Sequence, residues 1–462
     1  MSGPSPNATS YPEVSTTRLS LEEALASARE TKVLKLGNAL LKDLPDVFRE
    51  QFPGRHAWVI SDTMLETVVA REVHRRLAEA GLTQLPPFLF GPDVYAEYTF
   101  VTLLENALRG HDVIPVAVGS GTVNDLVKLA SHQVGRPYLC VATAASMDGY
   151  TAFGASITFR GAKQTFQCPA PRAVVADVEV VRSAPPEMTA SGYADLLAKV
   201  TAGADWIVAD ALGHEAIDSR AWSIVQGGLK QALGDPDGAR RGDSGAIFAL
   251  TQGLMLGGFA MQWSRSSRPA SGAEHQFSHL WDMEHHVHNG HAPSHGFKVG
   301  LATLVITAFY EALLRQPLDE CDIARCCEAW PAAAELEHNV RTMFAGEDFV
   351  ETAVVETAAK HCSRETLAEE LGRLRAVWPE LRRRLQTQLI PLPEVHDRLR
   401  RVGAPTHPSE IGLTPERVRR SFIRAYHIRR RYTVLDLAVR TQALEPCLEQ
   451  LFGANGLWSA HP

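Results

Sequence analysis

Three residues in the middle of the chain have side chains and spacing suited to a divalent metal ion. They are Asp195 in SGYADLLAKV, His275 in SGAEHQFSH and His295 in SHGFKVG, and each segment has the pattern of a separate helix. One carboxylate and two imidazoles leave a coordination position open, which is typical of a catalytic metal site and not of a closed structural one. The sequence therefore predicts a metal at these three residues, and oxygen and nitrogen ligands suit zinc, iron and nickel alike.

The alternative interpretation is an exposed histidine cluster that has no metal-binding function. Seven histidines fall between residues 275 and 295, so pairs of histidines at ligand spacing also arise by chance. We interpret HHVHNGH, residues 285–291, as an exposed loop with no ligand role. Spacing alone leaves both interpretations open.

Two further residues occupy helix positions beside the predicted ligands. Lys199 follows Asp195 by four residues, and His279 follows His275 by four. Residues four apart in a helix share a face, so we expect both side chains to lie next to a ligand.

A glycine-rich turn earlier in the chain has the features of a phosphate-binding loop. In VIPVAVGSGTVNDLVKLA, an apolar strand is followed by Gly119, Ser120, Gly121 and Thr122, and a helix begins near Val123. Glycine lets the backbone approach a phosphate closely, and a helix N-terminus attracts anions. The turn predicts a pyrophosphate site, although it is not the GxGxxG fingerprint and a purely structural turn is the alternative.

Asp62 ends the apolar run HAWVISD, which has the pattern of a buried strand. An acid at the end of an early strand accepts hydrogen bonds from the ribose of a dinucleotide in folds of this kind. The same carboxylate would repel a 2′-phosphate and so favours NAD over NADP. The alternative is an aspartate that only stabilises a turn.

Short apolar runs alternate with helical patterns only in the first part of the chain. The predicted strands are 56–62, 86–90, 112–119 and 137–143, which favours a parallel, twisted sheet with ligand sites at the carboxyl ends of its strands. Beyond residue 185 the patterns are helical, as in LTPERVRRSF, where Thr414 caps a helix that begins at Pro415. We therefore expect a disordered leader over 1–20, an α/β domain with a parallel sheet over 21–185 and an all-α domain over 186–462.

Composition and charge exclude several classes of protein. The net charge of −7 argues against nucleic-acid binding, and we interpret the basic runs 382–384 and 429–431 as solvated faces of helices. No uninterrupted apolar segment is long enough to span a membrane, and the N-terminus lacks a signal peptide. Seven scattered cysteines without CxxC spacing suit a reducing compartment. We expect a cytoplasmic protein.

Six ordered motifs resemble the sn-glycerol-1-phosphate dehydrogenase family, including its AraM-type bacterial members. The motifs, spread between about residues 30 and 440, are GSGTVND, TAASMDG, GYADLLAKVTAGADW, EHQFSH, SHGFKVG and IRRRYTVLDL. This family is similar in turn to glycerol dehydrogenase, the iron-containing alcohol dehydrogenases and dehydroquinate synthase. The resemblance implies a Rossmann-like NAD(P)-binding domain, a helical domain, a divalent metal in the cleft between them, and a homodimer.

The resemblance also implies a role for each residue that matches a family motif. Asp195, His275 and His295 would bind the metal, and Asp148 and His279 would face the substrate as candidates for proton transfer. The residues that would contact NAD or NADP are Asp62, Gly119, Ser120, Gly121, Thr122, Asp125, Thr143 and Ser146.

The implied reaction is the reversible interconversion of dihydroxyacetone phosphate and sn-glycerol 1-phosphate, in the reductive direction for lipid synthesis. The metal would act as a Lewis acid on the substrate oxygen while hydride passes to or from the nicotinamide. Lys163, Lys199 and Lys298 are candidates for binding the substrate phosphate. The alternatives are a dehydrogenase of another polyol or polyol phosphate, a lyase or cyclase of the dehydroquinate synthase type, and a nucleotide-binding regulatory protein without turnover.

Overall fold

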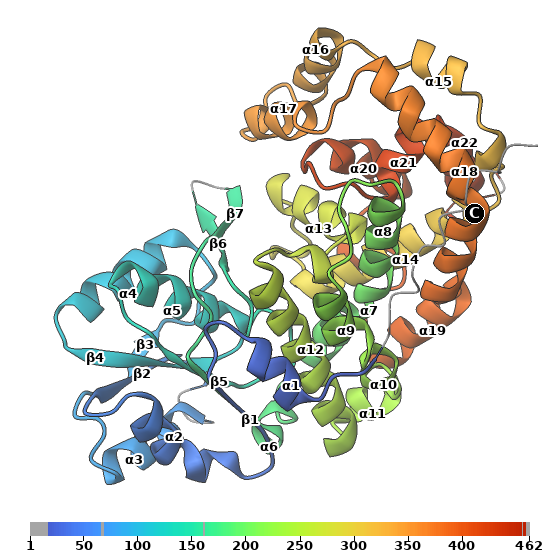
Figure 1. Ribbon diagram of the computed structural model, residues 1–462. Coiled ribbons are helices and arrows are strands. Elements are labelled where there is room, and N and C mark those ends of the chain that lie inside the picture. The colour runs from blue at the N-terminus through green and yellow to red at the C-terminus, as the bar shows by residue number, and fades with distance from the viewer. Residues whose placement is uncertain (1–16, 66–68, 160–161, 455, 459–462) are drawn as a thin grey trace, which may run out of the picture.

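The computed structural model describes residues 17–65, 69–159, 162–454 and 456–458 (Figure 1). Most of the predicted leader, residues 1–16, lies outside the described residues. The first helix, α1 (Leu21–Ser27), begins with a capping box, in which the backbone N–H of Glu23 donates to Ser20 Oγ and the backbone N–H of Ser20 donates to the Glu23 carboxylate. Helix α1 contacts the long helix α12 (Ser244–Ser264) and adds Ala24 to the core of the helical region.

The first part of the chain forms a six-stranded sheet in which every pair of neighbouring strands is parallel. The strand order is β1-β8-β5-β4-β2-β3. The strands are β1 (Val33–Gly37), β2 (His56–Asp62), β3 (Phe88–Phe90), β4 (Val113–Gly119), β5 (Leu139–Ala142) and β8 (Ala173–Asp177). All seven residues of β4 are buried, as expected for a central strand that is covered on both faces. The predicted parallel α/β architecture is confirmed.

Helices cover both faces of this sheet (Figure 1). On one face α4 (Tyr98–Arg109) and α5 (Gly121–Gln133) pack on Ile60 and Ala117. On the other face α2 (Leu44–Gln51) and α3 (Arg71–Glu79) pack on Val59 and Val116. A separate antiparallel hairpin, β6 (Ala155–Phe159) and β7 (Ala162–Phe166), contacts α13 (Ala273–Met283) of the helical region.

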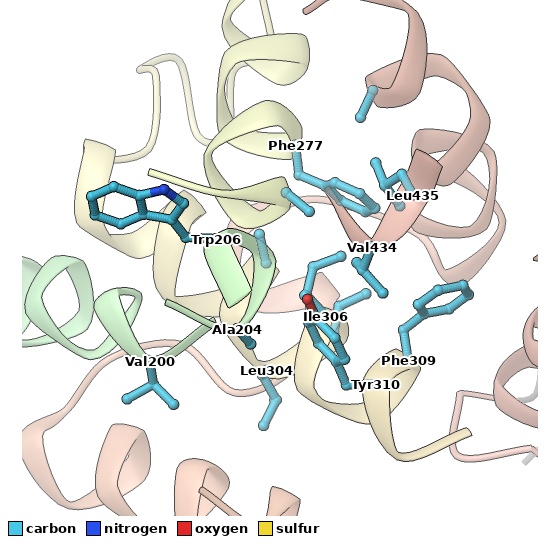
Figure 2. Close-up of a cluster of buried hydrophobic side chains, with 14 of the residues drawn as sticks. Val200, Ala204, Trp206, Phe277, Leu304, Ile306, Phe309, Tyr310, Val434 and Leu435 are labelled. Atoms are coloured by element: carbon cyan, nitrogen blue, oxygen red, sulfur yellow. The ribbon is translucent and has the colours of Figure 1, made fainter. Parts of the chain in front are cut away.

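All the described elements after β8 are helical. The α-helices are α6 (Val178–Val181), α7 (Pro186–Leu197), α8 (Lys199–Ala211), α9 (Ser219–Gln226), α10 (Leu229–Ala232), α11 (Pro236–Arg241), α12, α13, α14 (His295–Leu313), α15 (Ile323–Glu328), α16 (Ala333–Met343), α17 (Val350–Ala358), α18 (Arg364–Gln388), α19 (Leu392–Val402), α20 (Pro415–His427), α21 (Val434–Arg440) and α22 (Leu444–Phe452). Figure 2 shows part of their core, where Phe277, Ile306, Phe309 and Leu435 from α13, α14 and α21 come together.

Two helices, α12 and α14, are long and apolar enough to cross a bilayer. In α14 the apolar residues face other helices, because 89% of its most apolar window is buried inside the protein, and in α12 the fraction is 56%. Helix α14 contacts α7, α13 and α19, so its composition is accounted for by its position in the core.

The chain between α20 and α21 departs from the sequence-based expectation. Helix α20 begins as predicted, because the backbone N–H of Arg417 donates to Thr414 Oγ1 over 3.2 Å. Helix α20 ends at His427, and the next helix, α21, begins with a capping box between Thr433 and Asp436. The prediction that 429–431 forms a solvated helix face is therefore wrong, because this run lies in the irregular connection, where only Arg430 is exposed.

His427 gives a testable pH dependence of stability. The imidazole is 4% exposed and its Nδ1 lies 2.9 Å from Thr357 Oγ1. Burial, assisted by the charge of Lys360, lowers the pKa of His427 from its ordinary value of 6.5 to about 3. Below pH 6.5 the unfolded chain therefore binds a proton that the folded chain does not, and stability falls until the pH reaches the folded pKa.

We expect the His427→Gln variant to lose less stability on acidification than the wild-type protein. Between pH 7 and pH 5 the difference amounts to about 2 kcal/mol in the free energy of unfolding. Urea unfolding of metal-free protein at both pH values measures it, and His338→Gln, which changes an exposed histidine of α16, is the control. Equal losses in the His427 variant and the wild-type protein would contradict the assignment.

Candidate functional site

A cleft of about 640 Å³ lies at the carboxyl edge of the sheet, between the sheet and the helices that follow it. Its lining on the sheet side includes Ser120, Gly121, Thr122, Asp125 and Ser146, all of which the resemblance assigns to cofactor binding. On the helical side the lining includes His275, His279 and His295. The cleft therefore brings the glycine-rich turn and the histidines to one space, although more than 150 residues separate them in the sequence.

Three residues assigned to the cofactor do not line this cleft. Gly119 and Thr143 are buried, and the Thr143 backbone N–H donates to the Gly119 carbonyl over 3.2 Å. Asp62 ends β2 at the same edge of the sheet, and its Oδ1 accepts a hydrogen bond from the backbone N–H of Leu65 over 3.0 Å. That contact is the one expected of a turn aspartate.

The glycine-rich turn connects β4 directly to α5 and directs the N-terminus of α5 at the cleft. A Cβ atom on Gly119 would lie 2.5 Å from the Cβ of Val123, so the turn requires glycine at this position. Ser120 is the N-cap residue, but its side chain makes no capping hydrogen bond. The positive end of the helix dipole is thus available to an anionic group in the cleft.

Asp195, His275 and His295 converge from three different helices. Asp195 comes from α7, His275 from α13, and His295 is the first residue of α14. One ligand atom from each residue lies within 4.8 Å of the others, and Asp195 Oδ1 is 3.6 Å from His275 Nε2. Asp195 is fully buried and His275 is 6% exposed. This set of one oxygen and two nitrogen donors, bordering the cleft, fits a divalent cation with an open coordination position.

Two glycines let the helices that carry the ligands approach closely. A Cβ atom on Gly296 would lie 1.9 Å from the carbonyl oxygen of Ser191, so α14 touches the backbone of α7 at this point. A Cβ atom on Gly192 would lie 1.9 Å from the carbonyl oxygen of Ala145, which brings α7 against the turn that precedes Ser146. The small residues beside Asp195 and His295 therefore fix the distance between these two ligands.

Lys199 neutralises two carboxylates beside the ligand cluster. Its Nζ lies 2.8 Å from Asp195 Oδ1 and 2.7 Å from Asp148 Oδ2, and its side chain is fully buried. Burial and the neighbouring charge of Asp195 raise the pKa of Asp148. For Asp195 the effect of burial is outweighed by the charge of Lys199 and a hydrogen bond from His275, so its pKa lies well below the usual range.

Glu274 is a further residue of the site that the sequence reasoning missed. Its Oε1 lies 2.8 Å from His275 Nδ1, and its Oε2 accepts a hydrogen bond from Thr201 Oγ1 over 2.8 Å. Burial opposes protonation of His275, but the hydrogen bonds with Asp195 and Glu274 outweigh it and raise the pKa of His275. With Nδ1 bonded to Glu274, Nε2 faces Asp195 and is the nitrogen available to a metal.

We expect Glu274→Gln to weaken metal binding about 10- to 100-fold, because a neutral amide orients and polarises the imidazole less well than a carboxylate. Competition with a chromophoric chelator measures the metal affinity directly. Glu335→Gln, which changes an exposed glutamate of α16, is the matched control. An unchanged affinity in Glu274→Gln would show that this carboxylate does not support the ligand.

Two of the three lysines that were candidates for binding the substrate phosphate are already paired with carboxylates. Lys199 and Lys298, two of the candidates for binding a substrate phosphate, form buried ion pairs, Lys199 with the two aspartates and Lys298 with Asp282. The side chain of Lys163 lies outside the described residues.

The loop 285–291 is largely exposed as predicted, but His286 is buried, with its Nε2 2.6 Å from the Ile411 carbonyl oxygen.

His279 occupies the same face of α13 as His275, as predicted from their spacing. Its ring centroid lies 6.2 Å from that of His275 and 6.3 Å from that of His295. It lines the cleft beside the ligand cluster and is therefore placed to meet a substrate bound there.

Comparisons with known proteins show which proteins this chain is similar to. A sequence profile of the iron-containing alcohol dehydrogenases matches residues 35–185. The glycerol-1-phosphate dehydrogenase [NAD(P)+] of Halalkalibacterium halodurans is 33% identical over 294 residues, which cover 63% of this chain and 73% of that protein. The enzyme of the same name from Bacillus licheniformis is 30% identical over 424 residues, which cover 91% of each chain.

The solved structures that match share the fold at lower sequence identity. A probable glycerol dehydrogenase from Sinorhizobium meliloti superposes with a TM-score of 0.57 at 15% identity, covering 91% of this chain and 98% of the other. An alcohol dehydrogenase from Oenococcus oeni gives 0.56 at 14% identity, covering 91% and 99%.

Proposed function

Because this chain belongs to the glycerol-1-phosphate dehydrogenase family, we propose that it catalyses the reversible, NAD(P)H-dependent reduction of dihydroxyacetone phosphate to sn-glycerol 1-phosphate. The observation that carries the proposal is the convergence of Asp195, His275 and His295 in one cleft with the glycine-rich turn. The residues that we propose for the metal and for the dinucleotide are thus adjacent.

Residues of this chain would hold both cofactors. Asp195, His275 and His295 would bind the metal, and the turn 119–122 with Asp125, Thr143 and Ser146 would bind the dinucleotide, with Asp62 at the ribose. When bound, the divalent ion supplies Lewis acidity to the substrate oxygen and the nicotinamide supplies or accepts hydride. We assign dinucleotide binding to residues 21–185 and metal and substrate binding to 186–462.

The proton of the substrate hydroxyl would pass through His279 and Asp148. His279 lines the cleft next to the ligands, and an imidazole exchanges protons readily near neutral pH. Asp148 also lines the cleft, and its backbone N–H donates to Asp195 Oδ2 over 3.1 Å, which fixes its position. Lys199 balances the charge of both aspartates, so the ligand carboxylate stays ionised.

We further propose that the enzyme works as a cytoplasmic homodimer on a small phosphorylated substrate, with no nucleic-acid or membrane partner. Zinc, nickel and iron are the candidate metals. The Asp62 carboxylate favours NAD over NADP in this proposal.

The decisive experiment follows the oxidation of NADH and NADPH at 340 nm with dihydroxyacetone phosphate as the substrate. Purified protein should consume either cofactor in proportion to the ketone reduced, lose activity on chelation, and regain it with zinc, nickel or iron. The product should be inert to an enzyme specific for sn-glycerol 3-phosphate. An absence of net cofactor consumption would favour a cyclase or a non-enzymatic protein, and activity restricted to other ketones would favour another polyol dehydrogenase.

A further inference from the structure

The proposed substrate carries a phosphate, so the cleft should contain a positive charge that is not already neutralised. Lys199 does not meet this requirement because it pairs with Asp148 and Asp195. Arg265 also lines the cleft, but it lies 3.6 Å from Glu30 and its guanidinium rests over the ring of Phe153.

Arg429 is a cleft cation of a different kind. It lies in the connection between α20 and α21, and it lines the same cleft as His275, His279 and His295. Its side chain is partly buried and makes no hydrogen bond or ion pair with any residue that the structure describes. Its neighbour Arg430, by contrast, pairs with Glu356 over 2.6 Å.

Arg429 also borders a second cavity of about 540 Å³, where two of the other cations pair with carboxylates. Lys360 pairs with Asp436 over 3.1 Å, and Arg440 pairs with Glu370. Burial lowers the pKa of Arg429, and the charge of Glu356 opposes this only in part. An anion in the cleft would therefore stabilise a guanidinium that the protein itself leaves uncompensated.

The hydroxyl of Ser271 is a second polar group in the lining of this cleft that can still form a hydrogen bond. Ser271 lines the cleft, is 3% exposed, and its Oγ has no hydrogen-bond partner in the described chain. Arg431 positions this segment, because it donates to the Ser271 carbonyl over 2.6 Å and to Ser267 Oγ over 2.9 Å. These hydrogen bonds connect the segment 429–431 to the segment 267–271, which precedes α13 and its metal ligand His275.

We propose that Arg429 and Ser271 form the binding site for the phosphate of the substrate. This assignment rests on the proposed function and replaces Lys199 and Lys298, two of the lysines that the sequence suggested. A guanidinium and a hydroxyl are suitable donors to a phosphate dianion. Arg431 acts as a positioning residue for Ser271.

The test compares phosphorylated and unphosphorylated substrates in the metal-loaded enzyme. We expect Arg429→Met to lower kcat/KM for dihydroxyacetone phosphate about 10- to 100-fold and Ser271→Ala to lower it about 5-fold. For dihydroxyacetone, which lacks the phosphate, both variants should remain within twofold of the wild-type enzyme. Calorimetric titration with sn-glycerol 1-phosphate should show the same loss of affinity without depending on turnover.

Two further variants make the result unambiguous. Arg429→Lys keeps a positive charge and should recover part of the lost activity, whereas Arg420→Met, which changes an exposed arginine of α20, should have no effect. Equal losses with both substrates, or an unchanged kcat/KM in Arg429→Met, would overturn the phosphate assignment while leaving the proposed function intact. A wild-type enzyme that does not reduce dihydroxyacetone phosphate would instead refute the proposed function.

Discussion

Replacing His275 or His295 by alanine is expected to remove the bound metal and to lower kcat/KM for dihydroxyacetone phosphate by about three orders of magnitude. The Lewis acid contributes several kcal/mol to the stabilisation of developing negative charge, and each 1.4 kcal/mol corresponds to a factor of ten in rate. His279 is not part of the cluster of ligand atoms that Asp195, His275 and His295 form, so we do not expect it to replace either of the two histidines.

Metal analysis and circular dichroism separate this effect from misfolding. Both variants should fold, because the three ligand-bearing helices are anchored by an extensive apolar core and not by the metal. His291→Ala is the matched control, since His291 lies in the exposed loop and should leave metal content and turnover unchanged. Full turnover in both His275→Ala and His295→Ala would show that the ligand assignment is wrong.

The parts of this structure that could be predicted from sequence are those with a strong local pattern. The continuous apolar runs 56–62 and 112–119 became β2 and β4, because a strand buried on both faces has no polar alternation. The glycine-rich turn was recognisable because only glycine fits at Gly119. The four-residue spacing of His275 and His279 placed both on one helix face.

The contacts that could not be predicted are those in which local spacing gives no information. Adjacent helical residues do not normally face each other, so Glu274 gave no sign that its carboxylate would reach His275. Asp148 and Asp195 are 47 residues apart, and only the tertiary fold brings them to the same lysine. The prediction that Arg429 lies on a solvated helix face was wrong for a third reason. The capping box at Thr433 begins a new helix, so Arg429 lies in the connection between two helices and lines the cleft.

The second large effect is expected from Lys199→Met, which removes the cation between Asp148 and Asp195. Breaking a buried ion pair leaves unpaired charge in the interior, so the free energy of unfolding should fall by about 3–5 kcal/mol in metal-free protein. Activity should be lost as well, because the Asp195 carboxylate is no longer held in its ionised form. Urea unfolding in the presence of a chelator gives the stability, and Lys230→Met, which changes an exposed lysine of α10, is the control.

The pH dependence of this variant distinguishes a charge effect from a packing effect. In the wild-type protein the low pKa of Asp195 stabilises the fold above its ordinary value of 3.8, and this contribution is lost as the pH falls below that value. Without Lys199 the two carboxylates should bind protons more tightly when folded than when unfolded, so lowering the pH from 7 to 5 should stabilise Lys199→Met relative to the wild-type protein. Adding Asp148→Asn should restore part of the stability at pH 7 without restoring activity. If the loss is instead the same at every pH and persists in the double variant, Lys199 acts through packing and not through its charge.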